Sequence, residues 1–168
     1  LPVHYVASSA GSQGGTPWTF VQKLIGAYPE SITCKSKDGD TPLHLLMANA
    51  ALYVEKDRLV DRNTTKLVDL LMGQESNSEE STTSSAEDSK KKHRLEKAEN
   101  AQATNGPSPL LIQNVEDYSP LHTCAMYKTP PQLTRKLMEA PQAEAASTLT
   151  TRDGETALHL VCASSRHV

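Results

Sequence analysis

Three stretches of the chain carry apolar residues three and four positions apart, the spacing that places side chains on one face of a helix. They span residues 21–28, 67–71 and 133–138. Each stretch predicts an amphipathic helix that must pack its apolar face against another element. The faces are formed by Val21, Leu24, Ile25, Tyr28, Leu67, Leu70, Leu71, Leu133, Leu137 and Met138.

Another kind of helix start occurs where a hydroxyl residue precedes proline. Thr41 can accept a hydrogen bond from an early backbone N–H, as an N-cap does. Pro42 suits the first helical position because its φ is already helical and it lacks an N–H that would need a partner. The motif predicts a short capped helix from residue 42. Two later copies are Ser119 with Pro120, and Thr156 with Ala157, where alanine replaces proline.

Tight turns are predicted just before these helix starts. The dipeptide Asp-Gly occupies residues 38–39 and 153–154, and glycine adopts positive φ without steric cost. Asp117 and Tyr118 stand at the corresponding place in the other copy, so we expect a distorted turn there. The repeating unit is a turn, a short helix, a loop and a second helix. Neither helix can bury its apolar face alone, so neighbouring units must stack.

The turn and the helix start form a nine-residue motif that recurs: DGDTPLHLL at residues 38–46, EDYSPLHTC at 116–124 and DGETALHLV at 153–161. These stretches resemble the signature of ankyrin repeats, a Thr-Pro-Leu-His run after a turn. The first residues, LPVHYVASSAG, resemble a fourth copy around His4. The resemblance implies an all-α solenoid of stacked helix-turn-helix units joined by β-turn or hairpin loops. It also implies structural roles for Thr41, Pro42, His44, Ser119, Pro120, His122, Thr156 and His159.

The spacing of the motif histidines indicates how the chain is organised. His4 to His44, and His122 to His159, are separated by slightly more than the roughly 33-residue ankyrin period, whereas His44 to His122 is about twice that period. The residues between are mainly Ser, Thr, Glu and Lys, which cannot bury enough apolar surface to fold. We therefore expect repeats 1 and 2 in residues 1–73, a disordered insertion in 74–109, and repeats 3 and 4 in 110–168, the last one truncated.

Two loops are expected to depart from the common unit. Residues 11–15, GSQGG, should form a flexible loop between the two helices of repeat 1. Residues 52–65 should form a long loop between the two helices of repeat 2. Both ends of the chain fall inside a repeat, so we expect an excerpt of a longer array.

Composition and charge limit the classes of function. The 168 residues carry a formal net charge of −3, which gives no general attraction for nucleic acid, and no run reaches the roughly 18 apolar residues of a membrane span. Three cysteines without zinc-type spacing indicate reduced thiols. We therefore expect an intracellular, cytoplasmic monomer without a nucleic-acid partner. The basic run at 90–94 leaves a nuclear location open, although a solvated charge block is the simpler interpretation.

Candidate catalytic and metal-binding groups coincide with the repeat motif. His122 with Cys124, and His159 with Cys162, are close pairs in sequence. His122 and Cys124 are two apart and so do not share a helix face, and both pairs occupy repeat positions. No pairing of a nucleophile with a base, and no glycine-rich phosphate loop, stands apart from the repeat. We therefore expect a non-enzymatic protein with no catalytic residue, no metal and no cofactor.

By its resemblance to ankyrin repeats, the chain is expected to bind another protein through the concave face of the stacked units. Tyr118, Met126 and Tyr127 gather large side chains in the third unit, so we expect the strongest contacts there. The alternative is a regulatory domain that acts on another part of a larger signalling protein, such as a kinase or a channel. The expected partner-binding residues are Lys37, Asp38, Asp40, Asn49, Glu116, Tyr118, Met126, Tyr127, Arg152, Asp153 and Glu155.

Overall fold

The computed structural model describes residues 2–9, 17–54, 62–73 and 107–164. All of these residues belong to one compact unit. The predicted loop at 11–15 and most of the predicted insertion, including the basic run at 90–94, lie outside the described residues.

Among the described residues the chain forms helices and no strand, so the expected all-α class is confirmed. Proline stands first in several of these helices, as the helix-start motif predicted. The α-helices are α1 (Pro2–Ser9), α2 (Trp18–Ala27), α3 (Pro42–Val54), α4 (Arg62–Leu71), α5 (Pro120–Tyr127), α6 (Pro131–Met138), α7 (Ala143–Thr148) and α8 (Ala157–Ser164), and the short 3₁₀ helices are η1 (Pro29–Ile32) and η2 (Pro109–Leu111).

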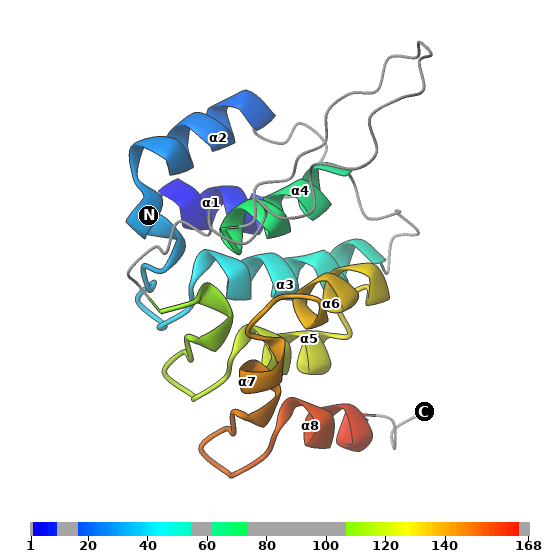
Figure 1. Cartoon of the computed structure of the whole chain (residues 1–168). Coiled ribbons are helices and arrows are strands. Elements are labelled where there is room, and N and C mark those ends of the chain that lie inside the picture. The colour runs from blue at the N-terminus through cyan, green and yellow to red at the C-terminus, as the bar shows by residue number, and fades with distance from the viewer. Residues whose placement is uncertain (1, 10–16, 55–61, 74–106, 165–168) are drawn as a thin grey trace, which may run out of the picture. The chain divides into compact units, whose positions relative to one another are not determined.

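The helices form two rows. The inner row consists of α1, α3, α5 and α8, each packed against the next. The outer row consists of α2, α4 and α6, which pack against α1, α3 and α5 in that order (Figure 1). α7 follows α6 and packs against it and against η2. The compact unit is therefore a succession of similar helix pairs.

The hydrophobic core lies between the two rows. Leu43, Leu46 and Met47 of α3 are completely buried, and Val68 and Leu71 of α4 are buried against the same cluster. The third unit continues this cluster through Leu121, Cys124, Leu133 and Leu137. α5 buries every residue from Pro120 to Ala125 against its neighbours, so each unit depends on the adjacent units for stability.

The predicted amphipathic faces are largely buried, with two exceptions at helix ends. Tyr28 is 61% exposed because α2 ends at Ala27, before the last position of the predicted face. Met138, the last residue of α6, is 52% exposed. The buried members of the predicted faces are Val21, Ile25, Leu67, Leu71, Leu133 and Leu137.

The structure also differs from the expected unit in its connections. α3 continues to Val54 and α4 begins at Arg62, so both ends of the long loop predicted at 52–65 are helical. α7 adds a second outer helix to the third unit, where a single one was expected. Pro109 is buried at the start of η2, so the compact structure resumes before the predicted boundary at residue 109.

Three turns share one backbone geometry: residues 36–40, 114–118 and 151–155. In each, the backbone N–H of the first residue donates to the carbonyl of the fifth, over 2.7, 2.9 and 2.8 Å respectively. The side-chain oxygen of the first residue in turn accepts the backbone N–H of the fifth. These first residues are Ser36, Asn114 and Thr151, types whose short polar side chains stabilise turns in this way.

The fourth residue of each turn has a left-handed backbone. Gly39 and Gly154 have φ of 78°, and Asp117 has φ of 63°. The prediction of a distorted turn at Asp117 is therefore wrong, because aspartate tolerates the left-handed region better than most side chains do and the same hydrogen bonds form around it.

The two glycines provide a matched test of turn packing. A Cβ atom at Gly39 would lie 2.7 Å from the backbone nitrogen of Val115, whereas a Cβ at Gly154 would meet no atom within 4 Å. Gly154→Ala should cost about 1 kcal/mol through backbone strain alone. Gly39→Ala should cost at least about 1 kcal/mol more, because the neighbouring turn must also move.

Urea unfolding of both variants measures this difference. Equal destabilisation by the two substitutions would contradict the close packing of turn 36–40 against turn 114–118.

Candidate functional site

A buried histidine joins each of α1, α3 and α5 to the turn of the next unit. His44 Nδ1 lies 2.8 Å from Thr41 Oγ1 and accepts the backbone N–H of Thr41 over 3.3 Å. On the other side of the ring, Nε2 lies 2.9 Å from the carbonyl oxygen of Tyr118. A neutral ring with its proton on Nε2 satisfies both contacts, since Nδ1 then accepts and Nε2 donates.

His122 makes the same bridge, whereas His4 makes only its outer contact, since its buried Nδ1 has no partner among the described residues. His122 Nδ1 lies 2.7 Å from Ser119 Oγ, and its Nε2 lies 3.1 Å from the carbonyl of Glu155. His4 Nε2 lies 3.0 Å from the carbonyl of Asp40. His159 repeats the inner half of the bridge, with Nδ1 at 2.9 Å from its own Thr156, but its Nε2 has no acceptor within the described ranges.

Burial favours the neutral form of two of these rings, those of His44 and His122. Desolvation lowers the pKa of His44 and of His122 below the ordinary value of 6.5, and outweighs the backbone carbonyls that raise it. Burial also raises the pKa of Cys124 to about 12, so its thiol is not a reactive group at neutral pH. The predicted motif residues Thr41, Pro42, His44, Ser119, Pro120 and His122 are buried, whereas Thr156 is half-buried and His159 is exposed.

All three cysteines are unpaired: Cys124 is buried, Cys34 half-buried and Cys162 exposed. In the part of the chain that the structure describes, no three His, Cys, Asp or Glu side chains group closely enough to hold a metal ion. No helix of that part is long and apolar enough to cross a membrane.

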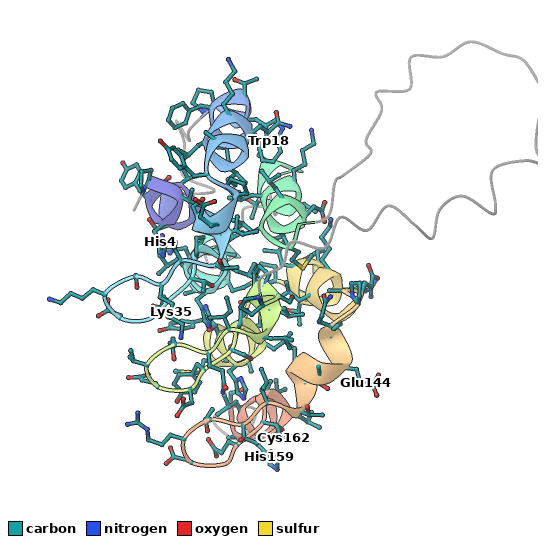
Figure 2. The ribbon with its side chains drawn as sticks, turned by 60° about the vertical axis from the view of Figure 1, so that its left-hand side comes forward. His4, Trp18, Lys35, Glu144, His159 and Cys162 are labelled. Atoms are coloured by element: carbon teal, nitrogen blue, oxygen red, sulfur yellow. The ribbon has the colours of Figure 1, made fainter. Side chains whose placement is uncertain are left out.

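The turns project from the same side of the inner row and are tied to one another (Figure 2). Asn114 Nδ2 donates to Asp40 Oδ1 over 2.9 Å, and Lys35 Nζ donates to the carbonyl of Gln113 over 2.6 Å. One turn further, Arg152 donates to the carbonyl of Val115 over 3.0 Å. These bonds hold successive turns side by side.

A groove of about 340 Å³ lies where turns 36–40 and 114–118 meet helices α3 and α5. We call it the turn groove. Three carboxylates line it, together with polar and apolar side chains from both helices. Its lining residues are Asp38, Asp40, His44, Leu45, Ala48, Asn114, Val115, Glu116, Tyr118, Thr123, Met126 and Tyr127.

Large side chains in the turn groove are only partly covered. Met126 is 46% exposed and Tyr127 is 50% exposed, although both belong to a helix whose other side is in the core. Tyr118 is half-buried, with its ring centroid 6.1 Å from that of His122. The groove therefore offers apolar contact area beside acidic groups.

The turn groove brings together six of the eleven residues predicted to bind a partner: Asp38, Asp40, Glu116, Tyr118, Met126 and Tyr127. The other five do not line it. Arg152 instead donates to the carbonyl of Val115 in turn 114–118, and Asn49 donates to the carbonyl of Leu45 in its own helix over 2.8 Å. The remaining three, Lys37, Asp153 and Glu155, belong to the turns but lie outside the groove.

Sequence reasoning missed five lining residues: Leu45, Ala48, Asn114, Val115 and Thr123. Helical periodicity in the sequence could have identified three of these five residues. Residues three apart share a helix face, so Thr123 lies on the same face as Met126, and Leu45 on the same face as Ala48. Val115 and Asn114 had no such signal, because only the stacking of the turns brings them to the groove.

No family model matches the chain, and comparison with curated proteins finds no match either.

Acidification should weaken folding through the two bridging histidines with lowered pKa. A histidine in the unfolded chain ionises near pH 6.5, whereas His44 and His122 in the folded chain have lower pKa values. The unfolded state therefore binds more protons, and the free energy of unfolding should fall as pH drops below about 6.5. Urea unfolding between about pH 7.5 and 5.5 measures the slope while most carboxyl groups stay ionised.

His44→Gln and His122→Gln should each reduce this pH dependence of the free energy of unfolding. NMR titration of the ring protons gives the pKa of each histidine directly. If the pKa of His44 or His122 in the folded chain is equal to or higher than that of a histidine in the unfolded chain, the neutral bridge is contradicted.

Proposed function

We propose that this chain is a non-catalytic protein-binding module built from ankyrin-like repeats, and that the turn groove receives a segment of a partner protein. Three features support the proposal. The helix pairs recur in the order that the sequence motif predicted, the turns stand side by side, and a buried histidine links each of α1, α3 and α5 to the next turn. Stacked units of this kind build extended surfaces that suit protein partners.

The observation that carries the proposal is the exposure of Met126 and Tyr127 in a groove that neighbouring units form together. Small polar side chains would suffice at solvent-exposed positions of an inner helix, but α5 has a methionine and a tyrosine there. Tyrosine is frequent among the residues that dominate binding energy at interfaces, and methionine adapts its shape to different contacts.

The groove also indicates what the partner segment carries. Asp38, Asp40 and Glu116 place three carboxylates around the exposed apolar side chains, and no lysine or arginine lines the groove. A partner segment with a basic side chain next to an apolar one fits this arrangement. Charges of this kind at the rim mainly raise the association rate and exclude acidic competitors.

Preorganisation favours binding at this position. The Asn114–Asp40 hydrogen bond holds one of the carboxylates in place, and the bridge of His44 to the carbonyl of Tyr118 holds the turn on which Tyr118 stands. A surface that is already ordered loses less conformational entropy when it binds.

The double substitution Tyr118→Ala with Tyr127→Ala tests the turn groove. Partner affinity should fall about tenfold or more, as expected when two anchor side chains are removed. Folding should be retained, because the bridge to His44 uses the backbone carbonyl of residue 118 and Tyr127 is half exposed. Affinity capture from a native lysate, followed by titration of the captured partner, measures the change.

Two other tyrosines provide a matched control. Tyr5 is 72% exposed and Tyr28 is 61% exposed, and neither lines the turn groove. The double variant Tyr5→Ala with Tyr28→Ala should keep the partner. If both double variants retain it equally, the turn groove is not the binding surface.

A further inference from the structure

Asp40 differs from the other two carboxylates of the turn groove. Its side chain is half-buried, whereas Asp38 and Glu116 are exposed. Asn114 Nδ2 donates to Asp40 Oδ1 over 2.9 Å, and none of the described residues donates to Asp40 Oδ2. The neighbouring turn therefore fixes the orientation of this carboxylate and leaves one of its oxygens without a donor.

The backbone of Asp40 is fixed as well. The N–H of Ser36 donates to the Asp40 carbonyl over 2.7 Å, and His4 Nε2 lies 3.0 Å from the same carbonyl oxygen. The N–H of Asp40 donates to Ser36 Oγ over 3.2 Å. A group that is held in this way loses little conformational entropy when a ligand binds, so Asp40 is the preorganised anion of the groove.

The charge of Asp40 has no opposite charge beside it. Among the described residues, neither a lysine nor an arginine forms an ion pair with Asp40. Two basic side chains of the turn region have other partners, since Lys35 donates to the carbonyl of Gln113 and Arg152 to the carbonyl of Val115. A cation that enters the turn groove would therefore find the carboxylate of Asp40 unpaired.

The turn groove lies between the second and third units, and described residues form both of its walls. Leu45 and Ala48 of α3 line one wall and are half-buried, while the exposed Met126 and Tyr127 of α5 line the other. Its volume of about 340 Å³ is near the lower end of the range of roughly 300–1,000 Å³ that is typical of small-ligand pockets. The groove therefore has room for single side chains of a partner segment.

Arginine is the basic residue that matches these features. Its planar guanidinium donates two parallel hydrogen bonds to a carboxylate, stacks on aromatic rings and is more weakly hydrated than the ammonium group of lysine. Its methylene stem packs on apolar side chains. A carboxylate accepts about four hydrogen bonds, so the bond from Asn114 leaves room for a guanidinium on Asp40.

We propose that the turn groove selects an arginine side chain of the partner segment, and that Asp40 determines this specificity. The inference rests on the proposed function, because it names the side chain that the same groove receives. The guanidinium pairs with Asp40 and stacks on the ring of Tyr127, while the stem lies against Leu45 and Ala48.

Four pools of synthetic peptides test the preference. Each pool has randomised flanks around a leucine that is followed by one fixed residue: arginine, lysine, asymmetric dimethylarginine or citrulline. Fluorescence anisotropy measures the apparent affinity of the whole chain for each pool. The arginine pool should bind at least about tenfold more tightly than the lysine pool. Dimethylarginine keeps the charge but blocks the paired hydrogen bonds, and citrulline has no charge, so both pools should also bind weakly.

Substitution of Asp40 assigns the preference to this residue. In Asp40→Asn the apparent affinity for the arginine pool should fall to within about twofold of that for the lysine pool. Folding should be retained, because the backbone bonds of residue 40 do not use its carboxylate. Glu155→Gln is the matched control, since Glu155 is also a half-buried acid at the fifth position of its turn but does not line the groove. This variant should keep the preference for arginine.

The other outcomes separate this inference from the proposed function. Equal affinity for the arginine and lysine pools, lost for both in the Tyr118→Ala, Tyr127→Ala variant, would overturn the arginine preference and leave the groove as a binding site. A preference that persists in Asp40→Asn would overturn the role of Asp40. If no pool binds more tightly than fully randomised peptides, the inference is wrong, while capture of a partner from lysate still tests the proposed function.

Discussion

The arrangement of this chain depends on one interaction, the hydrogen bonds that a neutral histidine makes on both sides of its ring. In His44, Nδ1 accepts the backbone N–H of Thr41 at the start of its own helix, while Nε2 donates to the carbonyl of Tyr118 in the turn of the next unit. The ring is buried, so the bond is strong and an unpaired nitrogen would be costly. A bond of fixed length between successive units sets both their spacing and their register.

This register explains why the turns line up. Each turn closes with the same backbone hydrogen bond, and its fifth residue offers a carbonyl to the histidine of the unit before. Side-chain bonds such as that of Asn114 to Asp40 then join neighbouring turns. The turn groove is a consequence of this alignment, since its two walls belong to units that are far apart in sequence and adjacent in the stack.

The mixed surface of the turn groove follows from its position in the stack. The turn groove lies at the junction of complete units, where polar turn residues meet the exposed side of α5, and its surface is mixed in character.

The sequence by itself determined the helix starts, the positions of the turns and most of the buried faces, because capping, φ preferences and helical periodicity act over a few residues. It therefore predicted Leu67 and Leu133 in the core and the turn tips Asp38 and Glu116 at a common surface. The tertiary structure decided that the turn at Asp117 is regular, that α7 joins the third unit, and that Val115 lines a groove. These features depend on contacts between units distant along the chain, and no local pattern in the sequence encodes such contacts.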